Sequence, residues 1–119
     1  MVSVEHFSNS ENTLAFPANS VVFRQGEPGE TMYAVQSGQI QIEHDGKTIA
    51  LLGPGSIFGE MALIDGSPRS ATAIAVTNSE LVQVDKYHFQ FLVHEAPTFA
   101  TRVMQTLSER LRSADELID

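Results

Sequence analysis

The hydrophobic and polar positions between about residue 13 and residue 85 follow the pattern of short strands separated by turns. Residues 39–43 alternate polar and apolar side chains, which is the period-two pattern of a strand with one buried face. The pair Asp45-Gly46 follows, and it is a strong signal for a tight hairpin turn. We therefore expect residues 48–52 to return as the partner strand. Many short strands with frequent turns predict an antiparallel sandwich or barrel.

Two more strands are predicted at residues 71–76 and 81–84, and the pattern changes after residue 85. Residues 86–94 carry apolar side chains at helical spacing, and Pro97 suits the first turn of a second helix. Along that second helix one apolar stripe recurs every four residues, with Met104 beside it. Its members are Phe99, Val103, Leu107 and Leu111.

Length and composition predict a single domain over residues 1–119, with a β-roll at about 13–85 and helices at about 86–113. The 119 residues are 42% hydrophobic, which is enough for a real core. There are no cysteines, so disulfides and thiolate metal sites are excluded. The first six residues lack the features of a secretory signal, and no apolar run approaches the ~18 residues of a membrane span. We expect a soluble, cytoplasmic protein.

The charge balance argues against nucleic acid as a partner. Seven basic residues stand against fifteen acidic ones, which gives a formal net charge of −8. DNA-binding surfaces need clustered Lys and Arg, and this sequence has no such cluster. We expect no direct binding to DNA. An anionic ligand would have to be held by local donors against an unfavourable overall field.

Features of known catalytic sites are missing from the sequence. A metal-dependent jelly-roll enzyme needs a His-x-His pair with a downstream Glu or His, and no His-x-His occurs. No serine lies in a nucleophile elbow, and no carboxylate pair suggests acid–base chemistry. We expect no enzymatic activity and no metal. The scattered histidines His6, His44, His88 and His94 are interpreted as solvated or capping residues.

Residues 58–73 carry the most specific chemistry of the chain. Here Gly59 and Glu60 stand ahead of Arg69, among small and apolar residues. Backbone amides at the start of a short helical turn after Gly59 would favour an anion. Arg69 offers a planar fork of donors that suits two phosphate oxygens. Glu60 is a good acceptor for a hydroxyl, although it could also cap that helical turn. The segment therefore predicts a pocket for a phosphate and a sugar hydroxyl together.

Two blocks of this segment resemble the phosphate-binding cassette of cyclic nucleotide-binding domains, a module of bacterial cyclic-AMP receptors and kinase regulatory subunits. The blocks are Phe58-Gly59-Glu60-Met61-Ala62-Leu63 and Pro68-Arg69-Ser70-Ala71-Thr72. The nine-residue spacing from Glu60 to Arg69 is usual in kinase-type cassettes. Upstream, residues 26–30 and 33–38 resemble the glycine-punctuated hairpin of the same family. The likeness runs from about Asn19 to about Leu92.

The resemblance implies a mainly β fold, an antiparallel β-jelly roll (double-stranded β-helix) with a short cassette helix and C-terminal α-helices. It implies a ligand, cyclic AMP or cyclic GMP, and no cofactor. Arg69 would bind the phosphate and Glu60 the ribose 2′-hydroxyl, while Gly59 and Ala62 would donate backbone amides. Phe58 and Leu63 would anchor the cassette in the core. The residues implied at the ligand are Phe58, Gly59, Glu60, Met61, Ala62, Arg69, Ser70 and Ala71.

Two points of ligand recognition stay open at this stage. The hydroxyl of Ser70 can reach the phosphate or the 2-amino group of a guanine, and it favours cyclic AMP only slightly. The base is expected to lie against apolar strand residues and a C-terminal cap. Candidates for that cap are Leu107, Leu111, Leu117 and Ile118.

The resemblance also implies how a signal would leave the domain. The helices after residue 85 would reposition on binding, and the stripe of the second helix would pack on the roll, cover the ligand or form a homodimer seam. Transcription factors of this family continue into a helix-turn-helix domain, whereas this sequence stops at Asp119. We expect a free-standing sensor that acts on an unidentified effector protein, or a domain separated from a larger regulator; the Met1 start favours the former. The alternative is a regulatory module that keeps the cassette and binds no nucleotide.

Overall fold

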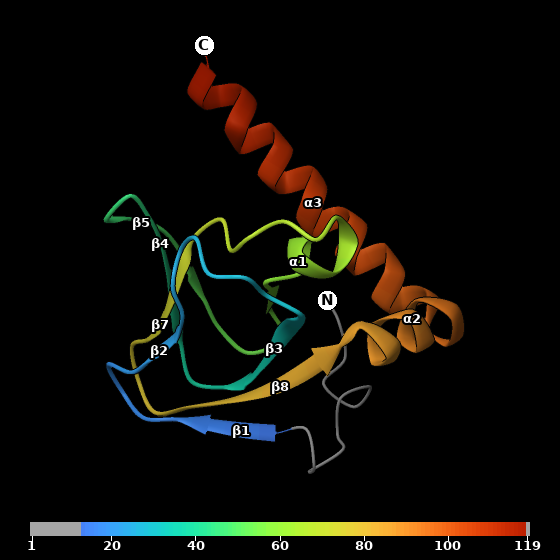
Figure 1. The fold of residues 1–119 in the computed structure, drawn as a ribbon, viewed down its shortest axis with the longest axis horizontal. Helices are drawn as coiled ribbons and strands as arrows, with labels where there is room; N and C mark the ends of the chain where they lie inside the picture. The colour runs from blue at the N-terminus through green and yellow to red at the C-terminus, as the bar shows by residue number, and fades with distance from the viewer. Residues whose placement is uncertain (1–12, 119) are drawn as a thin grey trace.

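Two four-stranded antiparallel sheets form the body of the structure, a computed structural model that describes the backbone of residues 13–118 and the side chains of residues 13–110. The sheets have the strand orders β1-β8-β3-β6 and β2-β7-β4-β5, so each joins strands that are distant in sequence. Figure 1 shows the sheets closing into a roll with the helices at one end. The strands are β1 Thr13–Phe16, β2 Val21–Phe23, β3 Thr31–Ser37, β4 Ile40–His44, β5 Lys47–Leu52, β6 Ile57–Phe58, β7 Thr72–Ala75 and β8 Ser79–Asp85. The expected mainly β, jelly-roll fold is confirmed.

The hairpin expected around Asp45-Gly46 is present. Strands β4 and β5 pair antiparallel from Ile40↔Leu52 to His44↔Lys47. Asp45 and Gly46 have φ of 51° and 82°, the left-handed conformation that such a two-residue turn requires. The register shifts between Ile42 and Glu43, which leaves Ile49 as the extra residue of β5.

The sheet that contains β3 and β8 is buried on both of its faces. Met32 and Ala34 of β3 belong to a core beneath the helices, together with Leu92, Phe99 and Val103. Tyr33 and Val35, which point the opposite way, belong to a second core between the two sheets. This continuous burial explains why residues 32–35 are apolar or aromatic without alternating with polar residues.

Three helices complete the fold: α1 Met61–Ile64, α2 Lys86–Glu95 and α3 Pro97–Ile118. Asp85 caps α2 by accepting a hydrogen bond from the backbone amide of His88. Helix α3 is one 22-residue helix and extends beyond the expected end near residue 113. In Figure 1 it leaves the roll at α2 and passes close to α1. No helix within residues 13–118 is long and apolar enough to cross a bilayer.

The apolar stripe of α3 divides into a buried part and an exposed part. Phe99 and Val103 are buried, and Leu107 packs partly buried against the same core. This confirms that the helix packs on the roll. Met104, which was expected beside the stripe, is 61% exposed. The side chain of Leu111 lies outside the described residues.

Candidate functional site

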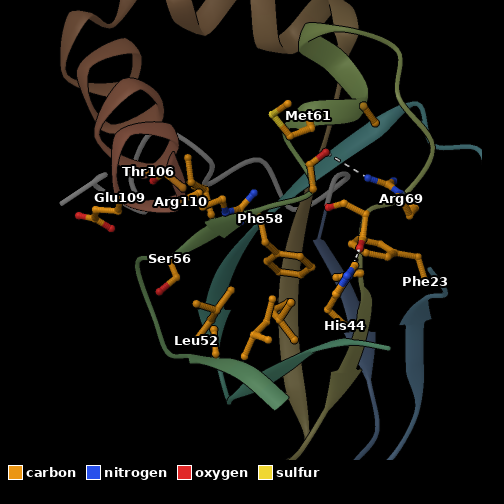
Figure 2. A pocket seen from close by; sticks show the side chains of 18 of the residues that line it. Phe23, His44, Leu52, Ser56, Phe58, Met61, Arg69, Thr106, Glu109 and Arg110 are labelled. Atoms are coloured by element: carbon orange, nitrogen blue, oxygen red, sulfur yellow. Dashed lines mark hydrogen bonds between the residues drawn. The ribbon is translucent and has the colours of Figure 1, made fainter. Parts of the chain in front are cut away.

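A cavity of about 520 Å³ opens between the roll, the loop around α1 and helix α3. Figure 2 shows Arg69 and Phe23 on one side of it and the α3 residues Thr106, Glu109 and Arg110 on the other. The segment that the sequence singled out supplies one wall. Of the eight residues implied at the ligand, the structure brings seven to this cavity: Phe58, Gly59, Met61, Ala62, Arg69, Ser70 and Ala71.

The guanidinium of Arg69 is buried and has only neutral acceptors. The side chain is 7% exposed. It donates from Nη1 to the carbonyl oxygen of Gly59 at 3.1 Å and from Nη2 to the hydroxyl of Thr31 at 3.3 Å. Its Nε is buried without a hydrogen-bond partner. Among the described residues, no carboxylate lies within ion-pair distance of Arg69.

Burial without a counter-charge lowers the pKa of Arg69. Loss of hydration disfavours the charged form, and the weaker fields of Tyr33 and Glu27 raise the pKa without cancelling this effect. The protein therefore holds a desolvated cation beside a cavity. A bound anion would remove much of the cost of that burial.

The backbone holds Arg69 at this place. Its amide donates to the carbonyl oxygen of Glu27 at 2.8 Å, and its carbonyl accepts from the amide of Gly26 at 2.8 Å. These contacts join the upstream glycine-rich loop to the cassette, two segments that the sequence showed only as separate blocks. Gly59 has φ of 78°, and a Cβ there would come within 2.8 Å of Arg69 Nη1. Glycine at position 59 therefore fits both the turn and the arginine.

Glu60 lies behind the cavity wall and does not line the cavity. It is fully buried, and its Oε1 accepts a hydrogen bond from Nη1 of Arg110 at 2.5 Å. Its Oε2 is buried without a partner. The expectation that Glu60 caps the short helix is wrong in one respect. Glu60 occupies the N-cap position of α1, but its side chain makes no capping hydrogen bond because the carboxylate turns toward α3.

Arg110 is a site residue that the sequence analysis missed. It comes from α3, fifty residues after Glu60, and it links the helix to the cassette. A signal was present, because Arg102, Thr106 and Arg110 recur every four residues and form a polar row beside the apolar stripe. Charges that flank the packed side of a helix call for partners.

His44 is solvated as expected, with its side chain 52% exposed. Its ring also lines the cavity and donates from Nδ1 to the carbonyl oxygen of Ser70 at 2.9 Å, a contact that the sequence did not indicate. This bond connects the β4–β5 hairpin to the end of the cassette. His94 also fits the interpretation as solvated, since it is exposed and pairs with the neighbouring Glu95. His6 lies outside the described residues.

The cassette is anchored as expected. Phe58 is fully buried between the sheets, and Leu63 packs partly buried beneath the helices. Ser70 is exposed at the cavity, so its hydroxyl can reach a ligand.

The strand β5 offers an apolar surface to the cavity. Ile49 lines the cavity and is nevertheless 62% exposed, and Leu52 lines it as well. Leu107, by contrast, packs against the core and is not part of the cavity lining, which contradicts its candidacy as a base cap. The other cap candidates, Leu111, Leu117 and Ile118, have side chains outside the described residues. Within the described part of the chain, no group of three or more His, Cys, Asp or Glu side chains could hold a metal ion.

Comparison with known proteins identifies the family of this site. The family model described as "Cyclic nucleotide-binding domain" matches residues 13–96. The chain is 38% identical over 109 residues to the "Cyclic AMP receptor protein" of Thermus thermophilus, covering 87% of this chain and 50% of that protein. It is 41% identical over 98 residues to a "Cyclic nucleotide-gated potassium channel" of Mesorhizobium japonicum, covering 82% of this chain and 27% of the channel.

A solved structure extends the likeness to three dimensions. The crystal structure of Thermus thermophilus catabolite activator protein matches with a TM-score of 0.82 and 36% sequence identity. The match covers 98% of this chain and 55% of that one. The chain therefore spans about half the length of the receptor protein that it matches, and about a quarter of the channel.

Proposed function

Since this chain belongs to the cyclic nucleotide-binding domain family, we propose that it is a non-catalytic sensor of a cyclic nucleotide. The ligand would bind in the cavity between the cassette and α3, with its phosphate at Arg69. Its binding would change how α3 packs and thereby regulate a partner protein or a further domain.

The observation that carries this proposal is the buried, unpaired guanidinium of Arg69 at the wall of a cavity. A desolvated cation with two neutral acceptors and an unsatisfied Nε is costly in the free protein. A singly charged cyclic phosphate would supply the missing counter-charge. The planar fork of arginine suits two phosphate oxygens better than the point charge of a lysine would.

The ribose hydroxyl would be recognised through Glu60. Its Oε1 is occupied by Arg110, but Oε2 is buried and still lacks a donor. A 2′-hydroxyl could satisfy Oε2 if the wall at Gly59 and Met61 adjusts to admit the ribose. Hydrogen bonds to charged groups are worth more than neutral ones.

The base would then extend toward β5, where Ile49 and Leu52 present apolar surface. Covering the exposed Ile49 side chain would contribute hydrophobic free energy without distinguishing adenine from guanine. Ser70 does not decide the base by itself, because its hydroxyl can serve either the phosphate or a guanine amino group. The slight preference for cyclic AMP rests on the resemblance to the bacterial cyclic-AMP receptors, which have serine at this position.

The signal would pass through Arg110. This residue joins α3 to the carboxylate that would also accept the ribose hydroxyl, so the ligand and the helix share one buried group. A ligand shifts the helix only if it binds one helix arrangement better than the other. The moving helix would act on an effector protein or further domain, or on a second copy of the chain through a homodimer seam.

A titration with cyclic AMP and cyclic GMP tests the proposal. We expect saturable binding at micromolar ligand, no comparable binding of the acyclic 5′-AMP, and weaker binding in both Arg69→Leu and Glu60→Ala, with the larger effect in Arg69→Leu. Leaving one side of a buried charge pair unpaired costs ~2–5 kcal/mol. Since each ~1.4 kcal/mol is tenfold, Arg69→Leu should weaken binding by roughly one and a half to three and a half decades.

The exposed Arg24 provides a matched control, and Arg24→Leu should leave the affinity within about twofold. Ligand at a hundred times the dissociation constant should also stabilise the protein by ~2.7 kcal/mol in a melting experiment. A wild-type protein that binds neither cyclic nucleotide would favour the alternative, a regulatory module that keeps the cassette without its ligand.

A further inference from the structure

The ring of Phe23 lies against the guanidinium of Arg69, with Arg69 Cζ 4.1 Å from the ring centroid. We propose that Phe23 is a positioning residue of the phosphate site, which holds the arginine in its binding orientation before the ligand arrives. The inference rests on the proposed function, because it assigns a role toward the same anion. Phe23 lies in the three-residue strand β2, and the residues around it in the sequence do not indicate this role.

The contact is of the kind that is strong when it is desolvated. The face of an aromatic ring attracts a cation, and this attraction grows when water is excluded from the pair. Arg69 is almost fully buried, and its hydrogen-bond acceptors are a carbonyl and a hydroxyl. Among the described residues, the ring is therefore a main source of attraction for the positive charge itself.

The guanidinium is also confined by the backbone on other sides. A Cβ on Gly29 would come within 2.4 Å of Arg69 Nε, and a Cβ on Gly59 within 2.8 Å of Nη1. The group therefore occupies a slot that two glycines leave open. The same Cβ on Gly59 would stand 3.3 Å from Phe23 Cε2, so the ring borders this slot directly.

Phe23 is itself held by neighbouring rings. Its centroid is 6.0 Å from that of Tyr33 and 5.8 Å from that of Phe58, and these two buried rings stack on each other at 5.4 Å. Phe16 joins the same cluster through an edge contact with Tyr33 at 6.5 Å. Phe58 directly precedes Gly59 in the cassette. The arginine that would bind the phosphate is thus fixed to the core through one ring.

This arrangement bears on affinity because a free arginine side chain loses much rotamer freedom when it is ordered. If Phe23 orders Arg69 in the free protein, the entropy loss of ordering the arginine is part of the free energy of folding. It then does not reduce the affinity for the ligand. Removing the ring while keeping an apolar side chain should therefore weaken binding. It should not abolish binding, because Arg69 itself remains.

The test compares Phe23→Leu, Phe23→Tyr and Phe16→Leu by titration of each 119-residue protein with cyclic AMP. We expect Phe23→Leu to weaken binding about tenfold. Phe23→Tyr keeps the aromatic face and should stay within about threefold of the wild type. Phe16→Leu removes a ring from the same cluster without touching Arg69, so it controls for a general loss of core packing.

A second measurement needs no ligand. In the wild-type protein, the Nε–H proton of Arg69 should show an upfield ring-current shift by NMR. That shift should be lost in Phe23→Leu and kept in Phe16→Leu. The shift reports the contact itself. The heteronuclear {1H}–15N NOE of Arg69 Nε reports the ordering of the side chain, and it should fall in Phe23→Leu and stay unchanged in Phe16→Leu, which a merely structural role for Phe23 would not produce.

Wild-type affinity in Phe23→Leu, or an equal loss in Phe16→Leu, would overturn the inference while leaving the proposed function intact. Absence of cyclic nucleotide binding in the wild type would contradict the proposed function and, with it, this inference. The two failures are therefore distinguishable in one experiment.

Discussion

Two arginines face each other across the cavity, and their surroundings differ. Arg110, on the helical side, is 42% exposed and donates to the fully buried carboxylate of Glu60 at 2.5 Å. Arg69, on the cassette side, is 7% exposed and donates only to a carbonyl and a hydroxyl. The more deeply buried cation is thus the one without an anionic partner.

The difference between the two arginines indicates two different roles, one structural and one in ligand binding. A charge pair such as Arg110–Glu60 fixes one element to another, here α3 to the cassette. An unpaired buried cation lowers stability and is retained where it serves binding. The comparison predicts that Arg110 matters most for the stability and coupling of α3, and Arg69 most for the ligand.

The largest stability effect is expected for Arg110→Met. This change leaves the buried carboxylate of Glu60 without its donor. Breaking a buried pair costs about 3–5 kcal/mol, and the partial exposure of Arg110 reduces this to about 2–3 kcal/mol. Urea unfolding would measure the loss.

The matched test of that prediction adds Glu60→Gln to Arg110→Met. Because the double variant no longer buries an unpaired charge, it should recover at least half of the lost stability. If Arg110→Met is as stable as the wild type, the pair does not fasten the helix and the comparison fails on the helical side.

The next effect concerns the ligand's hydroxyl. Cyclic 2′-deoxy-AMP cannot donate to Glu60, and loss of a hydrogen bond to a charged group is worth about 1.5 kcal/mol. We expect about tenfold weaker binding than for cyclic AMP by calorimetric titration. Glu60→Ala should bind both compounds equally. Persistent discrimination in Glu60→Ala would place the hydroxyl elsewhere.

A smaller effect, and of opposite sign, is expected for the stability of Arg69→Met. Replacing a buried, unpaired cation by an apolar side chain is often neutral or stabilising, here by up to about 1 kcal/mol. Unfolding of the ligand-free protein would show it, with Arg24→Met as the exposed control. A loss of more than about 2 kcal/mol would mean that Arg69 is primarily structural.

The smallest effect lies in the loop between the two halves of the cassette. The hydroxyl of Ser67, and then its amide at 2.9 Å, hydrogen-bond the carboxylate of Asp65 and lower its pKa below the usual 3.8. A lowered pKa contributes stability above 3.8 that is lost as the pH falls through the folded value. Asp65→Asn should therefore lower the unfolding midpoint slightly at pH 7, and this difference should shrink as the pH falls below 3.8. A midpoint difference that grows or stays constant as the pH falls would contradict this assignment.

Much of the fold could be predicted because its signals are local. The alternation of residues 39–43 and the pair Asp45-Gly46 indicated β4 and its hairpin, and the structure confirms both. β2 was not located individually. It has three residues, all half-buried, and is fixed by pairing with β7 fifty residues away, so its identity as a strand depends on tertiary contacts.

The residues of the site also divide into those indicated by local sequence and those that depend on tertiary contacts. The cassette is one continuous segment, so its spacing could be interpreted from the sequence alone. Arg110 and Phe23 reach the cassette from distant elements, and nothing near them in sequence specifies the partner. Glu60 shows the consequence, because its preference for Arg110 over the helix cap depends on a residue fifty positions away.

The most direct test of the account is a crystal structure of the protein with cyclic AMP. We predict that the Arg69 guanidinium lies within hydrogen-bond distance of two phosphate oxygens, with the 2′-hydroxyl on Glu60 Oε2. A complex in which the phosphate lies elsewhere, while Arg69 still donates only to Gly59 and Thr31, would contradict it.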